Sequence, residues 1–458
     1  MTTTSAQRIH IVGVGGPGTS AIAIILAEMG HRVSGSDVRE SQVLDRLRAA
    51  GVAVNVPHDP LVVHGCDIVT YSAAVRQTNA ELVAAAERGV RVLTRAAMLG
   101  WIATQATTIA VAGTHGKTTT TTLLTMMMRE AGRNPGYLIG ADVPQLPASA
   151  HWGDENFVVE ADESDSSHRA IKPYATILTN VDVDHLDEHG SYDGIVASFD
   201  EYLAEIRGPK VLCIDDPTTA RLAHEHSAIT YGLGAAMYRA TNVQFVAGGA
   251  RFMVEHPDGR HEVSLPLRGV HNVRNFLAAF AMARVLGVAA ESATRAVADF
   301  AGVHRRFEVR AHDAGATFID DYAHLPAEIA AVLAAVRADS AGSARVIAVF
   351  QPNRFNRMAV MSDAYRDAFI DADVVVITDI YASGTDRIEG VTGQLVVDAI
   401  RNAHPHARVE WRKERADLVE FVARECRDGD LCISMGCGDI ETFPDEVVAR
   451  RRELSRGA

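Results

Sequence analysis

A short glycine-containing run, Ala112-Gly113-Thr114-His115-Gly116-Lys117-Thr118, constrains the fold of this chain more than any other feature. It follows a strand-like stretch, 108–112, and precedes a stretch of helical composition, 119–130. Backbone N–H groups in such a loop can surround a phosphate, and the start of the helix adds positive potential. Lys117 can reach the terminal phosphates of a nucleotide, and the Thr118 hydroxyl can bind Mg²⁺. The run therefore predicts a phosphate-binding loop, in a variant form because Val111 replaces the usual first glycine.

Strand-like and helix-like segments alternate along the 458 residues, and the pattern restarts near 107 and again near 345. Such alternation predicts parallel sheets with crossover helices. Because a single core stops growing at roughly 250–300 residues, we expect several domains. We place three α/β domains at 1–104, 105–303 and 304–458. In the last of them, we expect a helix at 362–370 and a strand at 373–378.

Composition excludes several other classes of protein. The formal net charge of −14 argues against a large nucleic-acid footprint. The five cysteines are scattered without a CxxC pair, which argues against a disulfide framework or a zinc site and favours a reducing compartment. We see no signal peptide and no apolar run of about 20 residues. We therefore expect a cytoplasmic protein without nucleic-acid or membrane partners; its oligomeric state stays open.

Two acidic segments follow predicted strands. The run 160–165 comes directly after the strand 157–159, and Glu160 stands nearest to the strand end. Carboxylates at that position face the ligand crevice of an open α/β sheet, and Mg²⁺ prefers such hard oxygen ligands. The second segment, 179–185, follows the strand 175–178 and contains His185. His185 could complete a second metal site or could be a structural histidine.

The N-terminal run 13–18 matches the dinucleotide-binding fingerprint, and Asp37 ends the second predicted strand at the expected interval. The strand is expected at 8–14 and the helix after it at 19–29. This pattern predicts that the diphosphate of a nucleotide, either NAD or UDP, binds at the helix start. A tight turn that only serves packing would have the same sequence pattern. Three further clusters, 271–275, 305–307 and 320–324, could each be a cap, a surface ion pair or a strand end. Together they suggest one site between domains.

At this point the ordered set of motifs resembles the Mur ligase family from residue 8 to about 440. The segments that carry the resemblance are 113–120, 160–165, 271–275, 305–307, 320–322, 350–352 and 435–440. The resemblance is strongest to the members that add alanine. It implies a Rossmann-like N-terminal domain for the UDP-sugar substrate, a central P-loop ATPase domain and a Rossmann-like C-terminal domain for the amino acid.

The resemblance also implies a reaction. ATP phosphorylates the carboxylate of UDP-N-acetylmuramate, and the amine of an amino acid, by resemblance L-alanine, attacks the acyl phosphate in the synthesis of peptidoglycan precursors. ATP and Mg²⁺ would be the cofactors. No lysine lies between His185 and Lys210, so the carbamylated lysine of the later-acting family members has no candidate here.

Residue roles follow by resemblance, position by position. The catalytic set is Lys117, His185, Arg306 and Asp321. ATP would meet Gly113, Thr114, His115, Gly116, Lys117, Thr118, Thr119, Asn272, Asn275, Arg306 and Asp321. Thr118 and Glu160 would hold one metal ion, and His185 with Glu160 would help to hold a second. The UDP moiety would meet Gly15, Gly16, Gly18, Asp37 and Ser72, and the amino acid would meet Tyr322, His324, Arg354 and Arg357.

Two departures from the family pattern fall near the amine site. Leu325 and Asn353 each stand where the alanine-adding members usually have histidine. A related ligase that uses another amine or recycles a peptide is therefore an alternative. An NAD-dependent oxidoreductase and a non-catalytic nucleotide-binding regulator are further alternatives, but the first leaves the run 112–118 unexplained, and the intact Lys117 argues against the second.

Overall fold

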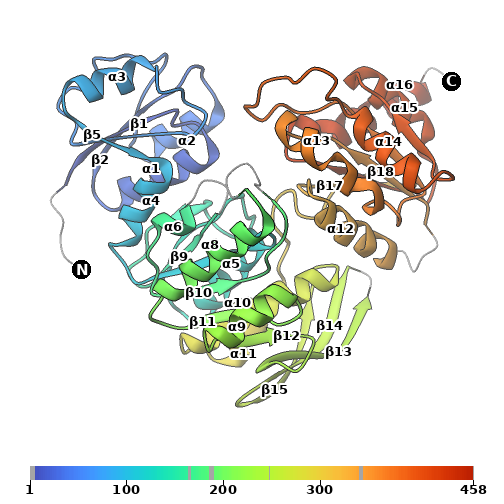
Figure 1. The fold of residues 1–458 in the computed structure, drawn as a ribbon, viewed down its shortest axis with the longest axis horizontal. Coiled ribbons are helices and arrows are strands. Elements are labelled where there is room, and N and C mark those ends of the chain that lie inside the picture. Colours follow the sequence, from blue (N-terminus) through green and yellow to red (C-terminus); the bar gives the residue numbers. More distant parts are fainter. Residues whose placement is uncertain (1–5, 163–166, 185–189, 247, 340–343, 457–458) are drawn as a thin grey trace. The chain divides into compact units, whose positions relative to one another are not determined.

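The computed structural model describes residues 6–162, 167–184, 190–246, 248–339 and 344–456. The chain divides into two compact units. The first contains Met1–Thr241, Met253–Val263 and Arg274–Asp299, and the second contains Asn242–Phe252, Ser264–Val273 and Phe300–Ala458. Three sheets, each with connecting helices, account for the regular structure (Figure 1).

The first sheet has five parallel strands in the order β3-β2-β1-β4-β5. Its strands are β1 (Arg8–Val12), β2 (Arg32–Ser36), β3 (Ala53–Asn55), β4 (Ile68–Tyr71) and β5 (Arg91–Thr94). Its helices are α1 (Pro17–Glu28), α2 (Gln42–Ala49), α3 (Ala80–Glu87) and α4 (Arg95–Ala103). Strand β1 ends at Val12, earlier than the pattern predicts, because Gly13 turns the chain with a φ of 73°.

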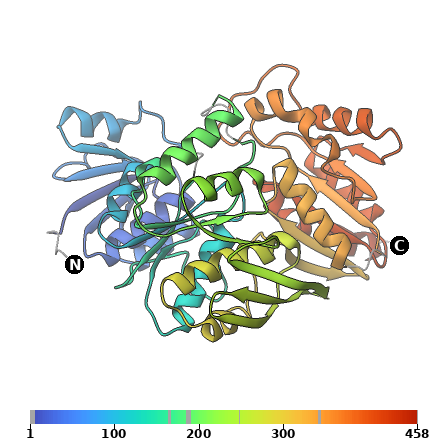
Figure 2. The ribbon, with the colours of Figure 1, turned by 60° about the horizontal axis from the view of Figure 1, so that its bottom comes forward.

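The second sheet has ten strands in the order β15-β14-β13-β12-β11-β10-β6-β9-β7-β8. They are β6 (Thr108–Ala112), β7 (Gly136–Leu138), β8 (Ala150–His151), β9 (Phe157–Glu160), β10 (Ala175–Leu178), β11 (Lys210–Cys213), β12 (Ile229–Gly232), β13 (Tyr238–Val246), β14 (Gly249–His256) and β15 (Gly259–Leu265). The helices are α5 (Lys117–Glu130), α6 (Ser167–Ala170), α8 (Tyr192–Glu205), α9 (Pro217–Glu225), α10 (Val270–Val285) and α11 (Ala290–Arg295). Figure 2 shows β13, β14 and β15 side by side in yellow-green at one end of this sheet.

Helix α5 explains the unusual run of threonines after the predicted phosphate loop. Residues 118–122 are all buried. The hydroxyl of Thr122 donates to Thr118 O at 2.8 Å, and that of Thr125 donates to Thr121 O at 2.8 Å. Because these two hydroxyls bond to carbonyls one turn back, Thr122 and Thr125 lie in the core without losing their hydrogen bonds.

The third sheet has six strands in the order β16-β17-β21-β18-β19-β20, and only β16 and β17 pair antiparallel. Its strands are β16 (Glu308–Asp313), β17 (Ala316–Asp321), β18 (Val346–Phe350), β19 (Val374–Ile377), β20 (Val409–Trp411) and β21 (Leu431–Met435). Its helices are α12 (Pro326–Asp339), α13 (Phe355–Met361), α14 (Gln394–Ala403), α15 (Arg415–Glu425) and α16 (Phe443–Arg456), with 3₁₀ turns η1 (Ser362–Asp367) and η2 (Asp439–Thr442). Separate apolar clusters cover its two faces.

The α/β class and the parallel sheets predicted from the alternating pattern are confirmed. One expected element is wrong: the segment predicted as a helix at 362–370 is the 3₁₀ turn η1, and the α-helix lies before it as α13. The Ala368 N–H bonds to Tyr365 O, the spacing of a 3₁₀ turn, and Tyr365 packs its ring on Phe350 with centroids 5.4 Å apart. Among the described residues, no helix combines the length and the apolar character that a bilayer crossing requires.

Candidate active site

The phosphate-loop candidate joins the end of β6 to the start of α5. Gly113 and Gly116 have φ angles of 119° and 81°, which side-chain-bearing residues rarely adopt. A Cβ on Gly113 would lie 2.2 Å from Thr179 Oγ1, and one on Gly116 would lie 2.3 Å from Asn275 Oδ1. Helix α5 begins at Lys117, two residues earlier than predicted, so Lys117 and Thr118 form its first turn. The N–H groups of this turn therefore belong to the anion-binding end of a helix.

Two side chains of this turn lie beside carboxylates. Lys117 Nζ donates to Gly113 O at 2.7 Å and to Thr114 O at 3.2 Å, and it lies 3.6 Å from Asp162 Oδ1. Thr118 Oγ1 donates to Glu160 Oε2 at 3.0 Å. The structure thus brings together the lysine, hydroxyl and carboxylate that the sequence indicates at the ends of β6 and β9.

Glu160 is in an electrostatically unusual position. Burial raises the pKa of its carboxyl group, and the Gly140 N–H, 2.6 Å from Oε1, together with Lys117 and Thr118, offsets this only in part. A cation near Oε2 would favour the ionised form. The hydroxyl and carboxylate oxygens are hard ligands of the kind that Mg²⁺ takes, so this pair fits the ion. His185, the other predicted metal ligand, lies outside the described residues, and the residues described elsewhere contain no cluster of three acidic, histidine or cysteine side chains suited to a metal.

The loop after β10 holds the phosphate loop from its side. Asn180 accepts the His115 N–H on Oδ1 at 2.8 Å, and its carbonyl oxygen accepts the Thr114 N–H at 3.2 Å. The imidazole Nε2 of His115 lies 2.9 Å from Asp182 Oδ2, and this hydrogen bond lowers the pKa of Asp182. The sequence pattern marks this segment for a second metal site but does not reveal that Asn180 and Asp182 support the phosphate loop.

The predicted ATP contacts from α10, Asn272 and Asn275, lie three residues apart on one helix. Asn275 lies against Gly116 and accepts the Thr120 hydroxyl at 3.4 Å, so it is next to the phosphate loop. Arg274 pairs with Asp215 at 2.8 Å. Asn272 belongs to the second unit, where its Nδ2 donates to Arg268 O at 2.8 Å.

A second glycine turn follows β1. The N–H groups of Gly13 and Val14 donate to Ser36 O at 2.8 and 3.0 Å, and the Gly15 N–H donates to Asp37 Oδ2 at 2.8 Å. A Cβ on Gly16 would lie 3.4 Å from Ser72 Oγ. The structure therefore gathers Gly15, Gly16, Asp37 and Ser72 at the carboxyl ends of β1, β2 and β4. Gly18 is the second residue of α1, where a Cβ would lie 2.8 Å from Arg95 Nη1.

In the second unit, the end of β17 carries a buried carboxylate. Asp321 accepts the Phe307 N–H on Oδ2 and the Ala323 N–H on Oδ1, both at 2.7 Å. Burial raises its pKa to about 6. The guanidinium of Arg306 lies 5.1 Å from the centre of the Tyr322 ring. The two predicted catalytic residues of this unit, Arg306 and Asp321, thus lie around one short segment.

Arg305 has a structural role that the sequence did not separate from that of Arg306. Its side chain is buried, bonds to Asp320 Oδ2 at 2.8 Å and donates to Gly436 O at 2.7 Å. These contacts fasten the junction before β16 to the ends of β17 and β21.

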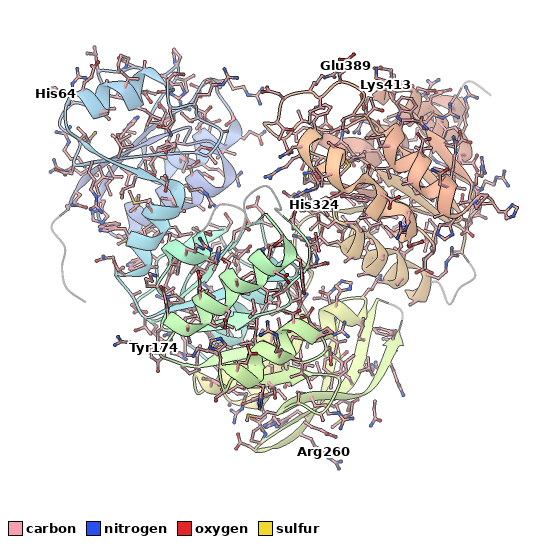
Figure 3. The ribbon with its side chains drawn as sticks, in the orientation of Figure 1. His64, Tyr174, Arg260, His324, Glu389 and Lys413 are labelled. Atoms are coloured by element: carbon pink, nitrogen blue, oxygen red, sulfur yellow. The ribbon has the colours of Figure 1, made fainter. Side chains whose placement is uncertain are left out.

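The four predicted amino-acid contacts form two pairs. The ring centres of Tyr322 and His324 are 5.5 Å apart, and His324 lies in the turn between β17 and α12 (Figure 3). Arg354 and Arg357 lie at the start of α13. Arg357 is buried and donates to Asn353 Oδ1 at 2.9 Å. Both family departures are therefore buried: Asn353 against Arg357, and Leu325 in the turn beside His324.

Comparison with known proteins agrees with this arrangement along the chain. Three family models match: Mur ligase family, catalytic domain, at residues 8–107; Mur ligase middle domain at 111–283; and Mur ligase, glutamate ligase domain, at 305–438. A UDP-N-acetylmuramate–L-alanine ligase of Rubrobacter xylanophilus is 40% identical over 449 residues, which cover 97% of this chain and 100% of the relative.

The chain belongs to the Mur ligase family. Among solved Mur ligase structures, the UDP-N-acetylmuramate–alanine ligase of Thermotoga maritima is 27% identical, with a TM-score of 0.80 over 98% of this chain and 100% of the other. A murein peptide ligase of Psychrobacter arcticus, 24% identical, shares the fold with a TM-score of 0.71 over 97% and 98% of the two chains. The resemblance to the family and its three-part architecture are confirmed.

Proposed function

We propose that this chain is an ATP-dependent ligase that joins L-alanine to the carboxylate of UDP-N-acetylmuramate in the synthesis of peptidoglycan precursors. The observation that carries this proposal is the convergence of Lys117, Thr118 and Glu160 at the start of α5. The names and full-length similarity of the relatives from Rubrobacter and Myxococcus xanthus support the choice of substrates.

The reaction has two group-transfer steps. A carboxylate oxygen of the substrate attacks the γ-phosphorus of ATP, and ADP leaves with the electrons of the broken P–O bond. The amine of L-alanine then attacks the acyl carbon, a C–N bond forms, and phosphate leaves after a proton is lost from nitrogen. Lys117 contributes to both steps by neutralising negative charge on the phosphoryl group, where catalysis depends mainly on positioning and electrostatics.

In this proposal Thr118 and Glu160 would hold one magnesium ion, and His185 with Glu160 would help to hold a second. Bound Mg²⁺ supplies positive charge to the phosphate oxygens. The chain's own residues do the rest of the work at this site: the N–H groups at the start of α5 orient the phosphates, and Asn180 and Asp182 keep the loop in shape.

The remaining residues take roles in binding. Gly113, Thr114, His115, Gly116, Thr119, Asn272, Asn275, Arg306 and Asp321 are assigned to ATP. Gly15, Gly16, Gly18, Asp37 and Ser72 are assigned to the UDP moiety, and Tyr322, His324, Arg354 and Arg357 to the amino acid. The proposed domains are 1–104, 105–303 and 304–458, each of which contains one of the three sheets. Because the five cysteines are scattered without a CxxC pair, which favours a reducing compartment, we place the enzyme in the cytoplasm.

A related ligase with another amine is the second candidate. Asn353, which departs from the family pattern, accepts a hydrogen bond from the buried Arg357. Arg357 is one of the residues predicted to bind the amino-acid substrate. The oxidoreductase alternative accounts for the N-terminal turn but leaves Lys117 and Glu160 without a role. The intact Lys117 and Glu160 argue against a regulator that has lost catalysis.

Phosphate release tests the proposal. The protein is incubated with ATP, Mg²⁺ and UDP-N-acetylmuramate and with each standard amino acid in turn, and the product is identified by mass. Release with L-alanine, together with the amide product, is the expected result. Release with a different amine would keep the ligase chemistry and replace the amino acid, whereas no release with any amine would contradict the proposal.

A further inference from the structure

Glu81, the second residue of α3, is a fully buried carboxylate in the N-terminal sheet region. Among the described residues, no lysine or arginine pairs with it; the titratable side chains beside it are two histidines. His10 Nε2 lies 3.5 Å and His58 Nδ1 lies 3.2 Å from Glu81 Oε2. Burying an ionised carboxylate is costly unless it is paired and hydrogen-bonded. Packing alone therefore does not explain why a glutamate occupies this buried position.

Its hydrogen bonds reach several segments at the carboxyl edge of the sheet. The Ser36 hydroxyl, at the end of β2, donates to Oε2 at 2.5 Å, and the Asp59 N–H, after β3, donates to Oε1 at 2.8 Å. His58 Nδ1 also lies 2.8 Å from Ser36 Oγ. The other histidine, His10, lies with its Nδ1 2.9 Å from Ser34 Oγ. One carboxylate thus connects β1, the end of β2 and the segment after β3.

Ser36 links Glu81 to the glycine turn through its backbone. Its carbonyl oxygen accepts the N–H groups of both Gly13 and Val14, and the next residue, Asp37, accepts the Gly15 N–H. The turn to which the UDP moiety is assigned is therefore held on one residue whose own side chain is fastened by Glu81. Burial works to raise the pKa of Glu81, but the contacts with His10, Ser36 and the Asp59 N–H outweigh it and lower the pKa below its usual value. The carboxylate is therefore ionised at neutral pH.

We propose that Glu81 is a positioning residue for the UDP-substrate subsite, which it holds in its binding geometry through Ser36 and His58. This inference rests on the proposed function and deepens it. Glu81 does not itself touch the substrate in this account: it sets the position of the turn at 13–16 and of the segment that carries His58. His58 is partly exposed, and its bonded Nδ1 leaves Nε2 on the opposite side of the ring.

Glu81→Gln tests the inference by separating kinetic constants. The amide has one acceptor oxygen for two donors and carries no charge. We expect the KM for UDP-N-acetylmuramate to rise about tenfold, the size of effect that follows from losing hydrogen bonds to a charged group, while kcat and the KM for ATP change less than about twofold. Affinity for UDP alone, measured by calorimetry, should fall by a similar factor.

Asn79→Ala is the matched control on the same helix. Asn79 Oδ1 accepts the Glu81 N–H at 2.9 Å and caps α3, so its loss weakens the helix without touching the carboxylate. Normal KM values are expected for this variant. An equal rise in the UDP-substrate KM for Asn79→Ala and Glu81→Gln would show a purely structural effect of α3 and overturn the inference, as would a folded Glu81→Gln enzyme with an unchanged KM.

His58→Gln covers the case in which Glu81→Gln does not fold, because the imidazole is partly exposed. The expected result is again a raised UDP-substrate KM with normal kcat, and an unchanged KM would overturn the inference. His226→Gln is a control in the same unit. His226 follows α9, and its imidazole lies 2.6 Å from Asp200 of α8, so its replacement should leave all kinetic constants unchanged. If the wild-type protein itself released no phosphate with any amine, the proposed function would fail, an outcome distinct from a variant that matches an active wild type.

Discussion

The two glycine turns of the first unit share one plan, strand–turn–helix, but differ in how a nearby glutamate is compensated. Beside the N-terminal turn, Glu81 receives a hydroxyl, a backbone N–H and two imidazole contacts, and its pKa is lowered. Beside the phosphate loop, burial raises the pKa of Glu160, although Thr118 and the Gly140 N–H bond to it. The contacts of the first carboxylate outweigh the effect of its burial, whereas those of the second offset it only in part.

Under the proposed function, this difference separates a substrate-binding turn from the turn at which phosphoryl transfer takes place. A carboxylate that is fully compensated by its own chain can hold backbone in place, and it has little to offer a ligand. A carboxylate whose burial is only partly offset gains from an added cation. The phosphate loop also brings Lys117 into its turn, whereas the corresponding N-terminal turn leads into α1 with Pro17 and Gly18 and presents Asp37 to the Gly15 N–H.

The largest expected effect is that of Lys117→Ala, which should lower kcat by about a thousandfold because charge on the transferred phosphoryl group loses its main protein partner. The folded state should persist, as checked by circular dichroism. Lys172→Ala is the control, since Lys172 is exposed and paired with Glu205 in the same unit. Near-normal turnover in a folded Lys117→Ala enzyme would contradict the assignment of phosphoryl transfer to the phosphate loop.

Glu160→Gln should separate activity from stability. Activity should fall by about a hundredfold, because a metal ligand is lost, yet the thermal unfolding midpoint without nucleotide should rise since an incompletely compensated buried charge is removed. Glu155→Gln is the control, because this carboxylate is already paired with Arg133; it should neither lower the activity nor raise the unfolding midpoint. A lowered midpoint together with full activity in Glu160→Gln would mean that Glu160 is a structural residue like Glu81.

Asp37→Asn should act on binding alone. Asp37 accepts N–H groups from Gly15 and Val38, and an amide keeps only one acceptor oxygen. We expect the KM for UDP-N-acetylmuramate to rise about tenfold with little change in kcat. Asp45→Asn, on the exposed face of α2, serves as the control. A large fall in kcat instead would place the N-terminal turn in the chemistry.

The smallest expected effect concerns pH. Because the pKa of Glu81 is lowered in the folded state, its stabilising contribution is present above the unfolded value of about 4.3 and is lost as pH falls through the folded pKa. Urea unfolding of wild type and Glu81→Gln should therefore differ most near neutral pH and converge in acid. A difference that grows as pH falls would mean that the folded pKa is raised.

Much of the site was accessible from sequence because it follows local chemistry. Glycines with positive φ, a lysine and a threonine at a helix start, and Glu160 at a strand end are all marked by their neighbours in the chain. The contacts of Asn180 and Asp182 with the phosphate loop could not be predicted from sequence, because they join residues more than sixty positions apart.

The same holds for Glu81, whose partners His10 and Ser36 lie on separate strands and look like ordinary polar positions in sequence. The segment predicted as a helix at 362–370 is a 3₁₀ turn, and its Tyr365 packs on Phe350 of β18, a contact that the local sequence does not reveal. The predicted role of His185, outside the described residues, stays a prediction, as do the domain boundaries.

The most direct test of the central claim follows oxygen from the substrate. UDP-N-acetylmuramate labelled with ¹⁸O in its carboxylate is incubated with ATP, Mg²⁺, L-alanine and the enzyme, and the released phosphate is weighed by mass spectrometry. An acyl phosphate made at the phosphate loop passes a single labelled oxygen to each phosphate and leaves one in the amide. Unlabelled phosphate would contradict the account, because the carboxylate would then never have been bonded to the γ-phosphorus.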